Sequence, residues 1–354
     1  MAEIELDALL EELVLKDGSD LHLRYGEPPI FRVAGNLERS EFPPLTDEDL
    51  EKLIFGLMKP VQKKIFEENL ELDMGYEIPG VARFRVNCFK QMGHIAAVMR
   101  IIPLKIKTID EWGFPQVFKK IAELPRGLVL VTGPTGSGKS TTLAAMIEYI
   151  NQNFKKHIIT IEDPIEFLHR DRQSIIEQRE IGIDTKSYSE ALRRAIRQNP
   201  DIILVGEMRD LETTAQTITA AETGHLVFST LHTIDAVQTV DRIIDIFPPS
   251  QQQQIRLQLS NTLQAVITET LVRKKDGAGR VAAFEIMVCT PAIRSAIREG
   301  KTVQIYTAIQ TGSKLGMIQM DQYLKNLVNQ GIVDFEEALA HCTNPDEFEK
   351  WRSG

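Results

Sequence analysis

The chain has 354 residues, enough for about two domains that each bury a core of their own. Its composition is ordinary for a globular protein, with 43% hydrophobic and 26% charged residues. The formal net charge of −9 disfavours a motor that grips a nucleic-acid backbone, because that binding depends on Lys and Arg side chains neutralising phosphates. We therefore expect no nucleic-acid partner.

Cysteine content and the N-terminal residues exclude further classes. The three cysteines, Cys88, Cys289 and Cys342, are too few and too scattered for a disulfide framework or a four-cysteine zinc site. The acidic N-terminus lacks the basic and apolar pattern of a signal peptide, and no apolar run approaches the length of a membrane span. We expect a cytoplasmic chain that contacts the membrane only through a partner.

The first hundred residues have the pattern of a small α+β domain. The sequence predicts an amphipathic helix at 3–14, a helix from Thr46 to about Met58, and strands at 20–24, 29–37, 72–78, 82–89 and 95–102. Thr46 is a good N-cap because three acidic residues follow it in the first turn. We therefore expect a first domain over 1–102 and a motif-free linker or hinge over 103–125.

From Gly127 the pattern changes to strands that alternate with helices, which is typical of a parallel sheet. Strands are predicted at 127–131, 157–161, 201–205 and 225–231, and a capping box at Ser187–Glu190 opens a helix that Pro200 closes. Beyond Ser250 the chain is expected to be helical, with Leu259, Leu263, Val266 and Ile267 on one face. The predicted fold is α/β, with a second domain over 126–354 that ends in helices.

A complete phosphate-binding loop lies between the first of these strands and the helix after it. The segment reads Gly-Pro-Thr-Gly-Ser-Gly-Lys-Ser, and its glycines let backbone amides wrap a polyphosphate. Lys139 is expected to reach the β- and γ-phosphates, and the Ser140 hydroxyl to bind Mg²⁺. ATP and Mg²⁺ are therefore the expected cofactors. The predicted nucleotide contacts are Gly133, Pro134, Thr135, Gly136, Ser137, Gly138, Lys139, Ser140 and Thr141.

Acidic residues follow two of the predicted strands, at the edge of the sheet where ligands bind in open α/β folds. Glu207 follows the apolar run 202–205 and is predicted to orient and deprotonate the attacking water and to hold Mg²⁺, directly or through water. Position 206, where many such enzymes carry an Asp, is Gly. Glu162 and Asp163 follow the preceding strand and are predicted to assist catalysis, although Asp163 also suits a turn cap before Pro164.

Two histidines flank the fourth predicted strand. His225 and His232 are seven residues apart, so alternation along a strand sends their side chains to opposite faces and they cannot share a metal. His232 follows the carboxyl end of the strand and can sense the γ-phosphate. His225 lies at the other end of the strand, where local geometry makes a nucleotide contact harder to reach and a structural role is the alternative.

Rapid cleavage of a triphosphate generally needs a second cation besides the loop lysine, sometimes supplied by a neighbouring subunit. Arg193 and Arg197 are four residues apart, a spacing that predicts one helical face. Arg83, Arg85 and Arg100 fall on predicted strands of the first domain. All five are candidates for contacts with the nucleotide, although a surface arginine is often only a solvated charge.

Three segments resemble motifs of the secretion ATPase superfamily. Residues 160–166 (Thr-Ile-Glu-Asp-Pro-Ile-Glu) resemble its aspartate box, 199–210 its atypical Walker B segment, and 223–233 its histidine box. Within that superfamily, the segments 19–23, 259–271 and 292–299 are similar to those of the type IV pilus retraction ATPases. The extension and type II secretion ATPases usually carry a longer N-terminal region and a four-cysteine zinc element, and this sequence has neither.

The resemblance implies a PAS-like N-terminal domain, a RecA-like ATPase domain and a homo-hexameric ring with ATP between subunits. It implies that Glu207 is the catalytic glutamate, that both histidines matter, and that arginines of the first domain reach the nucleotide. The implied function is ATP-driven pilus retraction in twitching motility, at the inner membrane, through a pilus platform protein (PilC-like) and indirectly the pilin fibre. The alternatives are an assembly ATPase for pilus extension or type II secretion, and a nucleotide-gated binding module that does not hydrolyse ATP.

Overall fold

The computed structural model describes residues 4–102 and 105–353, which form two compact units. The N-terminal unit contains Met1–Ile106 together with Pro164–Leu168, and the C-terminal unit contains Lys107–Asp163 and His169–Gly354. A short segment of the second half of the sequence therefore belongs to the first unit. The residues before position 4, including Glu3 of the predicted first helix, lie outside the described residues.

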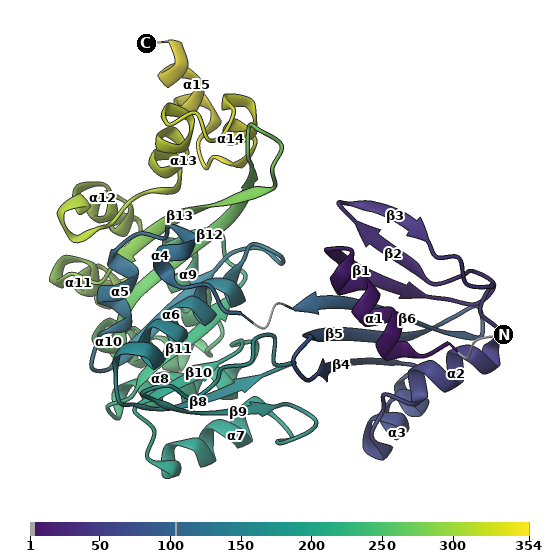
Figure 1. Cartoon of the computed structure of the whole chain (residues 1–354). Helices are drawn as coiled ribbons and strands as arrows, with labels where there is room; N and C mark the ends of the chain where they lie inside the picture. Colours follow the sequence, from purple (N-terminus) through teal and green to yellow (C-terminus); the bar gives the residue numbers. More distant parts are fainter. Residues whose placement is uncertain (1–3, 103–104, 354) are drawn as a thin grey trace. The chain divides into compact units, whose positions relative to one another are not determined.

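The N-terminal unit is a six-stranded antiparallel sheet in the order β3-β2-β1-β6-β5-β4, with helices α1, α2 and α3 (Figure 1). The sheet alternates buried and exposed residues, as in β5, where Phe84 and Val86 are buried and Arg83 and Arg85 face the other side. Thr46 caps α2, with its side chain accepting a hydrogen bond from the Asp49 amide. The elements are α1 Leu6–Leu15, β1 Gly18–Leu23, β2 Ile30–Val33, β3 Asn36–Arg39, α2 Asp47–Phe55, α3 Pro60–Asn69, β4 Glu71–Ile78, β5 Ala82–Gln91 and β6 His94–Ile102.

The C-terminal unit is built on a seven-stranded mixed sheet in the order β13-β12-β7-β11-β10-β8-β9. All neighbouring strands are parallel except β12 and β13, which form an antiparallel hairpin. The central strands are buried along their whole length because helices cover both faces of the sheet (Figure 1). The strands are β7 Gly127–Thr132, β8 His157–Glu162, β9 Ile175–Glu180, β10 Ile202–Val205, β11 Leu226–Leu231, β12 Leu263–Arg273 and β13 Arg280–Val288.

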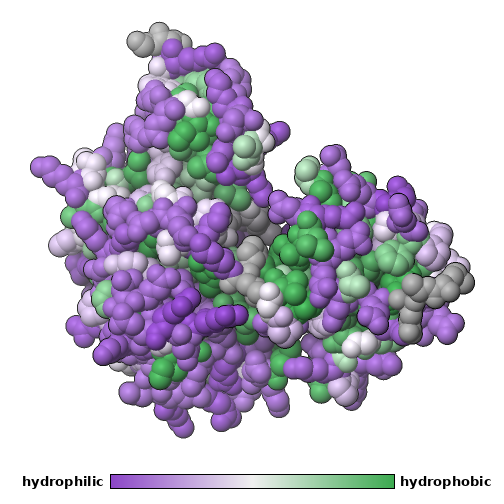
Figure 2. Space-filling model, in the orientation of Figure 1, coloured by the Kyte–Doolittle hydropathy of each residue, from purple (hydrophilic) through white to green (hydrophobic). Residues whose placement is uncertain are grey.

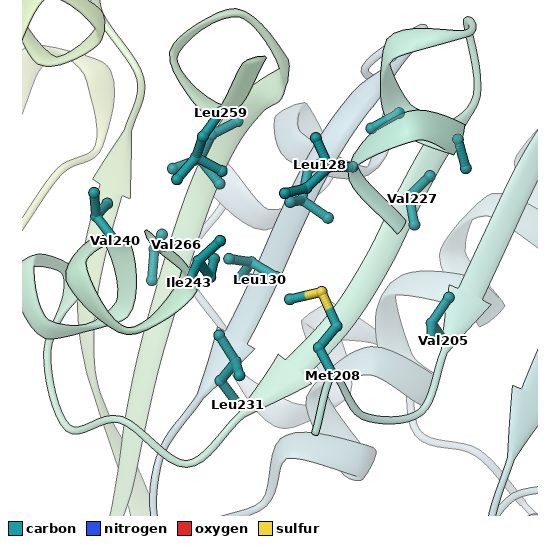
Figure 3. Close-up of a cluster of buried hydrophobic side chains, with 14 of the residues drawn as sticks. Leu128, Leu130, Val205, Met208, Val227, Leu231, Val240, Ile243, Leu259 and Val266 are labelled. Atoms are coloured by element: carbon teal, nitrogen blue, oxygen red, sulfur yellow. The ribbon is translucent and has the colours of Figure 1, made fainter. Parts of the chain in front are cut away.

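Two hydrophobic clusters hold helices on the two faces of this sheet, and a third packs the C-terminal helices against Val272 and Ala283. The first lies between the strands and helices that include α9 and α10, and Val240 and Leu259 belong to the same buried cluster as Leu130 and Val266 of the sheet (Figure 3). The second lies under α4, α5 and α6. The helices are α4 Ile109–Trp112, α5 Val117–Ala122, α6 Lys139–Asn153, α7 Tyr188–Ala195, α8 Leu211–Glu222, α9 Ala236–Asp245, α10 Pro249–Thr262, α11 Pro291–Glu299, α12 Val303–Thr311, α13 Met320–Asn329, α14 Phe335–His341 and α15 Pro345–Ser353.

Two segments differ from the sequence predictions. The helix expected beyond Ser250 ends at Thr262, and Leu263–Arg273 forms strand β12, because pairing with β7 decides the conformation of this apolar run. Residues 107–125, expected in the linker, carry α4 and α5, and Phe118 is fully buried against Phe284. Residues 103 and 104 lie outside the described residues.

The predicted fold class is confirmed, with an N-terminal antiparallel-sheet domain and a mixed, largely parallel sheet in the second unit. Among the described residues, we find no helix that combines the length and the hydrophobicity needed to span a bilayer. The face of the molecule drawn in Figure 2 carries hydrophilic residues over most of the C-terminal unit, with hydrophobic residues in small groups.

Glu285 on β13 is a buried carboxyl whose ionisation the fold disfavours. It accepts a hydrogen bond from the Ala236 amide at 2.8 Å, at the start of α9. Burial nevertheless raises the pKa of Glu285 to about 7, from 4.5. Because the folded state holds the proton more tightly than the unfolded state, the free energy of unfolding should fall as pH rises from about 4.5 to about 7.

Between about pH 4.5 and about pH 7, the free energy of unfolding should therefore fall less for Glu285→Gln than for the wild-type chain. The difference should be a few kcal/mol at most, which is the size that a pKa shift of this order produces. Denaturant unfolding followed by tryptophan fluorescence would measure it. Both tryptophans, Trp112 and Trp351, lie in the C-terminal unit with Glu285, so the signal reports the relevant unit. Parallel stability curves for the two proteins would contradict the prediction.

Candidate nucleotide-binding and hydrolysis site

The phosphate loop connects the end of β7 to the start of α6. Gly133 and Gly138 have φ angles of 143° and 108°, a region of backbone space that residues with a Cβ rarely adopt. A Cβ on Gly133 would also collide with the carbonyl oxygen of Glu269 on β12. The loop therefore needs glycine at these positions for both conformation and space. Its backbone turns into the first turn of α6, where free amides and the helix dipole favour an anion.

Lys139 lies at the first position of α6, with its ammonium over the loop. Its Nζ donates hydrogen bonds to the carbonyl oxygens of Gly133 at 2.9 Å and Pro134 at 3.0 Å. Ser140 follows and is partly exposed, and the loop tip from Pro134 to Gly136 is exposed. The predicted phosphate ligands are therefore grouped on one accessible loop.

Glu207 follows the carboxyl end of β10, and both of its carboxylate oxygens have partners. Oε1 lies 3.0 Å from His232 Nε2, and Oε2 lies 2.8 Å from the Arg209 guanidinium. Burial by itself would raise the pKa of Glu207, but Arg209 and, less strongly, His232 outweigh burial and hold that pKa below its usual value. Glu207 is thus an anion with a fixed orientation. Sequence reasoning placed Glu207 and His232 at this edge but assigned no role to Arg209.

Tyr188 and the backbone of β8 leave little room for a side chain at Gly206, before Glu207. A Cβ on Gly206 would lie 2.8 Å from the Tyr188 hydroxyl and 3.2 Å from the Ile161 carbonyl oxygen. Burial, followed by the negative charges of Asp163 and Glu207, raises the pKa of Tyr188, so its phenol stays neutral among these acids. Tyr188 was missed because it lies at the start of α7, far from the loop in sequence.

Glu162 ends β8, next to β10 in the sheet. Its Oε1 accepts hydrogen bonds from Thr160 Oγ1 at 2.7 Å and from Gln178 Nε2 at 3.2 Å. Asp163 follows it and is the last residue of this segment that belongs to the C-terminal unit. The charges of both acids act on Tyr188, as does that of Glu207, so the structure brings the two predicted acidic groups to one edge of the sheet.

The arginine candidates lie in different surroundings. In the N-terminal unit, Arg83 Nε donates to the Ile165 carbonyl oxygen at 3.1 Å, and Arg85 pairs with Glu166 at 3.0 Å. Both arginines thus hold the Pro164–Leu168 segment, which directly follows Glu162 and Asp163 in the chain. Arg100 pairs with Asp20 at 2.8 Å.

Arg193 and Arg197 lie in two successive helical segments. Helix α7 ends at Ala195, and Arg197 lies in a following 3-10 turn, Ile196–Gln198. Asn199 then adopts a left-handed conformation with φ 56°, which ends the helical segment before Pro200. Arg193 pairs with Glu212 at 2.7 Å, and Arg197 is exposed.

The two histidines lie at opposite ends of β11, as the spacing predicted. His232 contacts Glu207 at the carboxyl end. His225 precedes the strand, and its Nδ1 lies 2.9 Å from the Ala220 carbonyl oxygen at the end of α8. Within this chain the structure does not bring His225 to the loop, and its local contacts are those of a structural residue.

The donor atoms at this edge suit Mg²⁺, which prefers oxygen ligands and keeps several waters. A hydroxyl from Ser140 and carboxylates from Glu162, Asp163 and Glu207 are available, and the described residues contain no cluster of three or more His, Cys, Asp or Glu arranged to hold a metal alone. The fold, the loop and the strand-end acids together define an ATPase of the P-loop class.

Comparison with known proteins specifies the family. Residues 1–340 match the family described as type II/IV secretion system protein. The chain is 53% identical over 345 residues to the type IV pilus retraction ATPase PilT of Pseudomonas aeruginosa, covering 98% of this chain and 100% of that protein. It is 40% identical to the type IV pilus ATPase PilU of the same organism, covering 97% of this chain and 90% of that protein.

A crystal structure described as the pilus retraction motor PilT with bound ADP has a TM-score of 0.91 and 45% identity to this chain. The match covers 98% of this chain and 100% of that one. The chain belongs to the type II/IV secretion system protein family and is an ATPase of that family. Its resemblance to the type IV pilus retraction ATPases, predicted from sequence motifs, is confirmed.

Proposed function

We propose that this chain hydrolyses ATP as a ring hexamer to power type IV pilus retraction and twitching motility. The observation that carries the chemistry is Glu207, held as an anion by Arg209 and His232 at the same sheet edge as the phosphate loop. Identity to pilus retraction ATPases across nearly the whole chain supports the assignment of this chemistry to retraction.

In the proposed mechanism the loop amides and Lys139 bind the β- and γ-phosphates. Mg²⁺, when bound, neutralises phosphate charge, and Ser140 and Glu207 would hold it, Glu207 directly or through water. Glu207 orients the attacking water toward the γ-phosphate and accepts its proton as the oxygen attacks. His232, within hydrogen-bonding distance of Glu207, fixes the carboxylate and senses the γ-phosphate. Glu162 and Asp163 position water at the same edge.

Coupling to the pilus is proposed to need other subunits. A hexamer would place ATP between subunits, so that Arg83, Arg85, Arg100, Arg193 or Arg197 of a neighbour could complete the site. His225, remote from the loop within one chain, would act in the same way. Movement of the N-terminal domain would then turn an inner-membrane platform protein and withdraw pilin from the fibre. The chain would act in the cytoplasm and reach the membrane through that platform.

Deleting the gene in its own organism should leave cells that carry pili but do not twitch, because fibres would still be assembled and no longer withdrawn. Electron microscopy of pili and a stab-agar motility assay measure the two traits. Complementation with the wild-type gene should restore movement. Cells without pili would instead indicate an assembly ATPase for extension, and a purified hexamer that binds ATP without hydrolysing it would indicate a binding module.

A further inference from the structure

Glu269 lies on β12 directly behind the phosphate loop, and neither the motifs nor the mechanism above gives it a role. Its side chain is 1% exposed. Thr142 Oγ1, in the first turns of α6, donates a hydrogen bond to Glu269 Oε2 at 2.6 Å. The other oxygen, Oε1, is buried and has no hydrogen-bond partner among the residues that the structure describes. A buried and half-satisfied carboxyl is costly, so its position calls for a reason.

The loop glycines bring the backbone close to this carboxyl. A Cβ on Gly138 would lie 3.1 Å from Glu269 Oε1, and one on Gly133 would overlap the Glu269 carbonyl oxygen. The unpaired oxygen therefore faces the segment of the loop that wraps the phosphates. Glu269 accepts a hydrogen bond from Thr142 of α6 and packs against the loop. It therefore contacts both the loop and the helix, whose geometry must be kept when a nucleotide binds.

Few charges surround the carboxyl. Across the hairpin, β13 places Phe284 opposite Glu269, and the neighbouring β7 ends with Thr132, which bonds to Thr268. The charged group that acts on Glu269 is Lys139, from the loop and α6. Burial raises the pKa of Glu269 to about 8, although Thr142 and Lys139 act to lower it. At neutral pH the carboxyl is therefore mainly neutral.

We propose that Glu269 is a positioning residue for nucleotide binding that works as a neutral carboxylic acid behind the phosphate loop. In this form it fixes Thr142 and supports the loop without adding charge. Oε1, which faces Gly138, is the atom available to carry the proton. When ionised, Glu269 repels the nucleotide phosphates through the loop and competes for Lys139, so nucleotide binding is coupled to proton uptake by this side chain. The proposal rests on the nucleotide-binding role of the loop.

The test measures ADP binding by the full chain between about pH 7.5 and about pH 9, with Mg²⁺ in fixed excess. If binding takes up one proton, the logarithm of the Kd rises by up to about one per pH unit above the pKa of Glu269. The wild-type Kd should therefore rise about tenfold over this pH range. Calorimetry in two buffers of different ionisation enthalpy should show proton uptake. Glu269→Gln keeps the shape and the acceptor for Thr142 but cannot ionise, so its Kd should stay constant within about twofold.

Glu285→Gln is the matched control, since it removes another buried carboxyl from the same hairpin, on the strand that does not pair with β7, and should keep the wild-type pH dependence. Equal slopes for the wild-type chain and Glu269→Gln, or a flat wild-type profile without proton uptake, would overturn the proposal. If Glu269→Gln fails to fold, proton uptake by the wild-type chain still decides. Absence of ADP binding at about pH 7.5 would instead count against the nucleotide site itself.

Discussion

Replacing Glu207 with Gln is expected to lower the kcat for ATP hydrolysis by about 100-fold to about 10,000-fold, the usual contribution of a general base. The Gln amide has the same shape and can still contact His232 and Arg209, but it cannot accept a proton from water. Glu207 lies at the strand edge rather than in the loop, so the Kd for ADP measured without Mg²⁺ should change by less than about threefold. Steady-state ATPase assays and ADP titrations of the full chain measure both quantities.

Glu222→Gln offers a control with the same chemical change. Glu222 ends α8, and its carboxylate contacts Gln258 at 3.0 Å on the exposed surface, at the far end of that helix from the strand-end acids. This variant should keep wild-type turnover. Wild-type turnover in Glu207→Gln would remove the assigned base, and would leave Glu162 or Asp163 as the acids to examine next.

The features that sequence reasoning identified are those whose signal is local. Gly133–Ser140 is a contiguous motif, with a buried strand before it and a helix after it, so sequence alone fixes both its conformation and its place. Glu207 and His232 could be placed at one edge of the sheet because each directly follows an apolar strand, and parallel strands end at one edge. Their mutual contact at 3.0 Å is a consequence of the order β11-β10 in that sheet.

Sequence reasoning missed the residues that reach this edge of the sheet only through tertiary contacts. Tyr188 and Glu269 approach the site from α7 and β12, and nothing in their sequence neighbours indicates a phosphate loop. Arg209 is only two residues from Glu207, yet an arginine after a turn is usually solvated, and its pairing depends on how the turn folds back. A polar residue that directly flanks a recognised strand-end acid is the one signal that would have suggested it.

Strand β12 shows a limit of periodicity. Leu259, Leu263, Val266 and Ile267 are spaced as on one face of a helix, but the first belongs to α10 and the other three to the strand. A strand that is buried on both faces has apolar residues at consecutive positions, so a helical spacing can be found within it. The β-branched residues of 266–268 favoured the strand, and pairing with β7 determines it.

Replacing Lys139 with Ala is expected to raise the Kd for ADP by about 10-fold to about 150-fold, the equivalent of one lost charge-assisted hydrogen bond of about 1.5–3 kcal/mol. ATPase activity should fall below about 1% of wild type, because the γ-phosphate also loses the cation that balances its developing charge. The structure makes this residue hard to replace, since its Nζ lies within 3.0 Å of two loop carbonyl oxygens and no other residue of the motif carries a positive charge.

Lys156→Ala separates the role of this ammonium from a general loss of positive charge. Lys156 pairs with Asp201 at 3.2 Å at the amino ends of the strands, far from the loop, and an exposed pair of this kind contributes at most about 1 kcal/mol. The ADP affinity and the ATPase turnover of Lys156→Ala should match those of the wild-type chain. If Lys139→Ala bound ADP as tightly as Lys156→Ala, the phosphates would have to bind elsewhere. A nucleotide whose phosphates lie in this loop would contact the Lys139 ammonium.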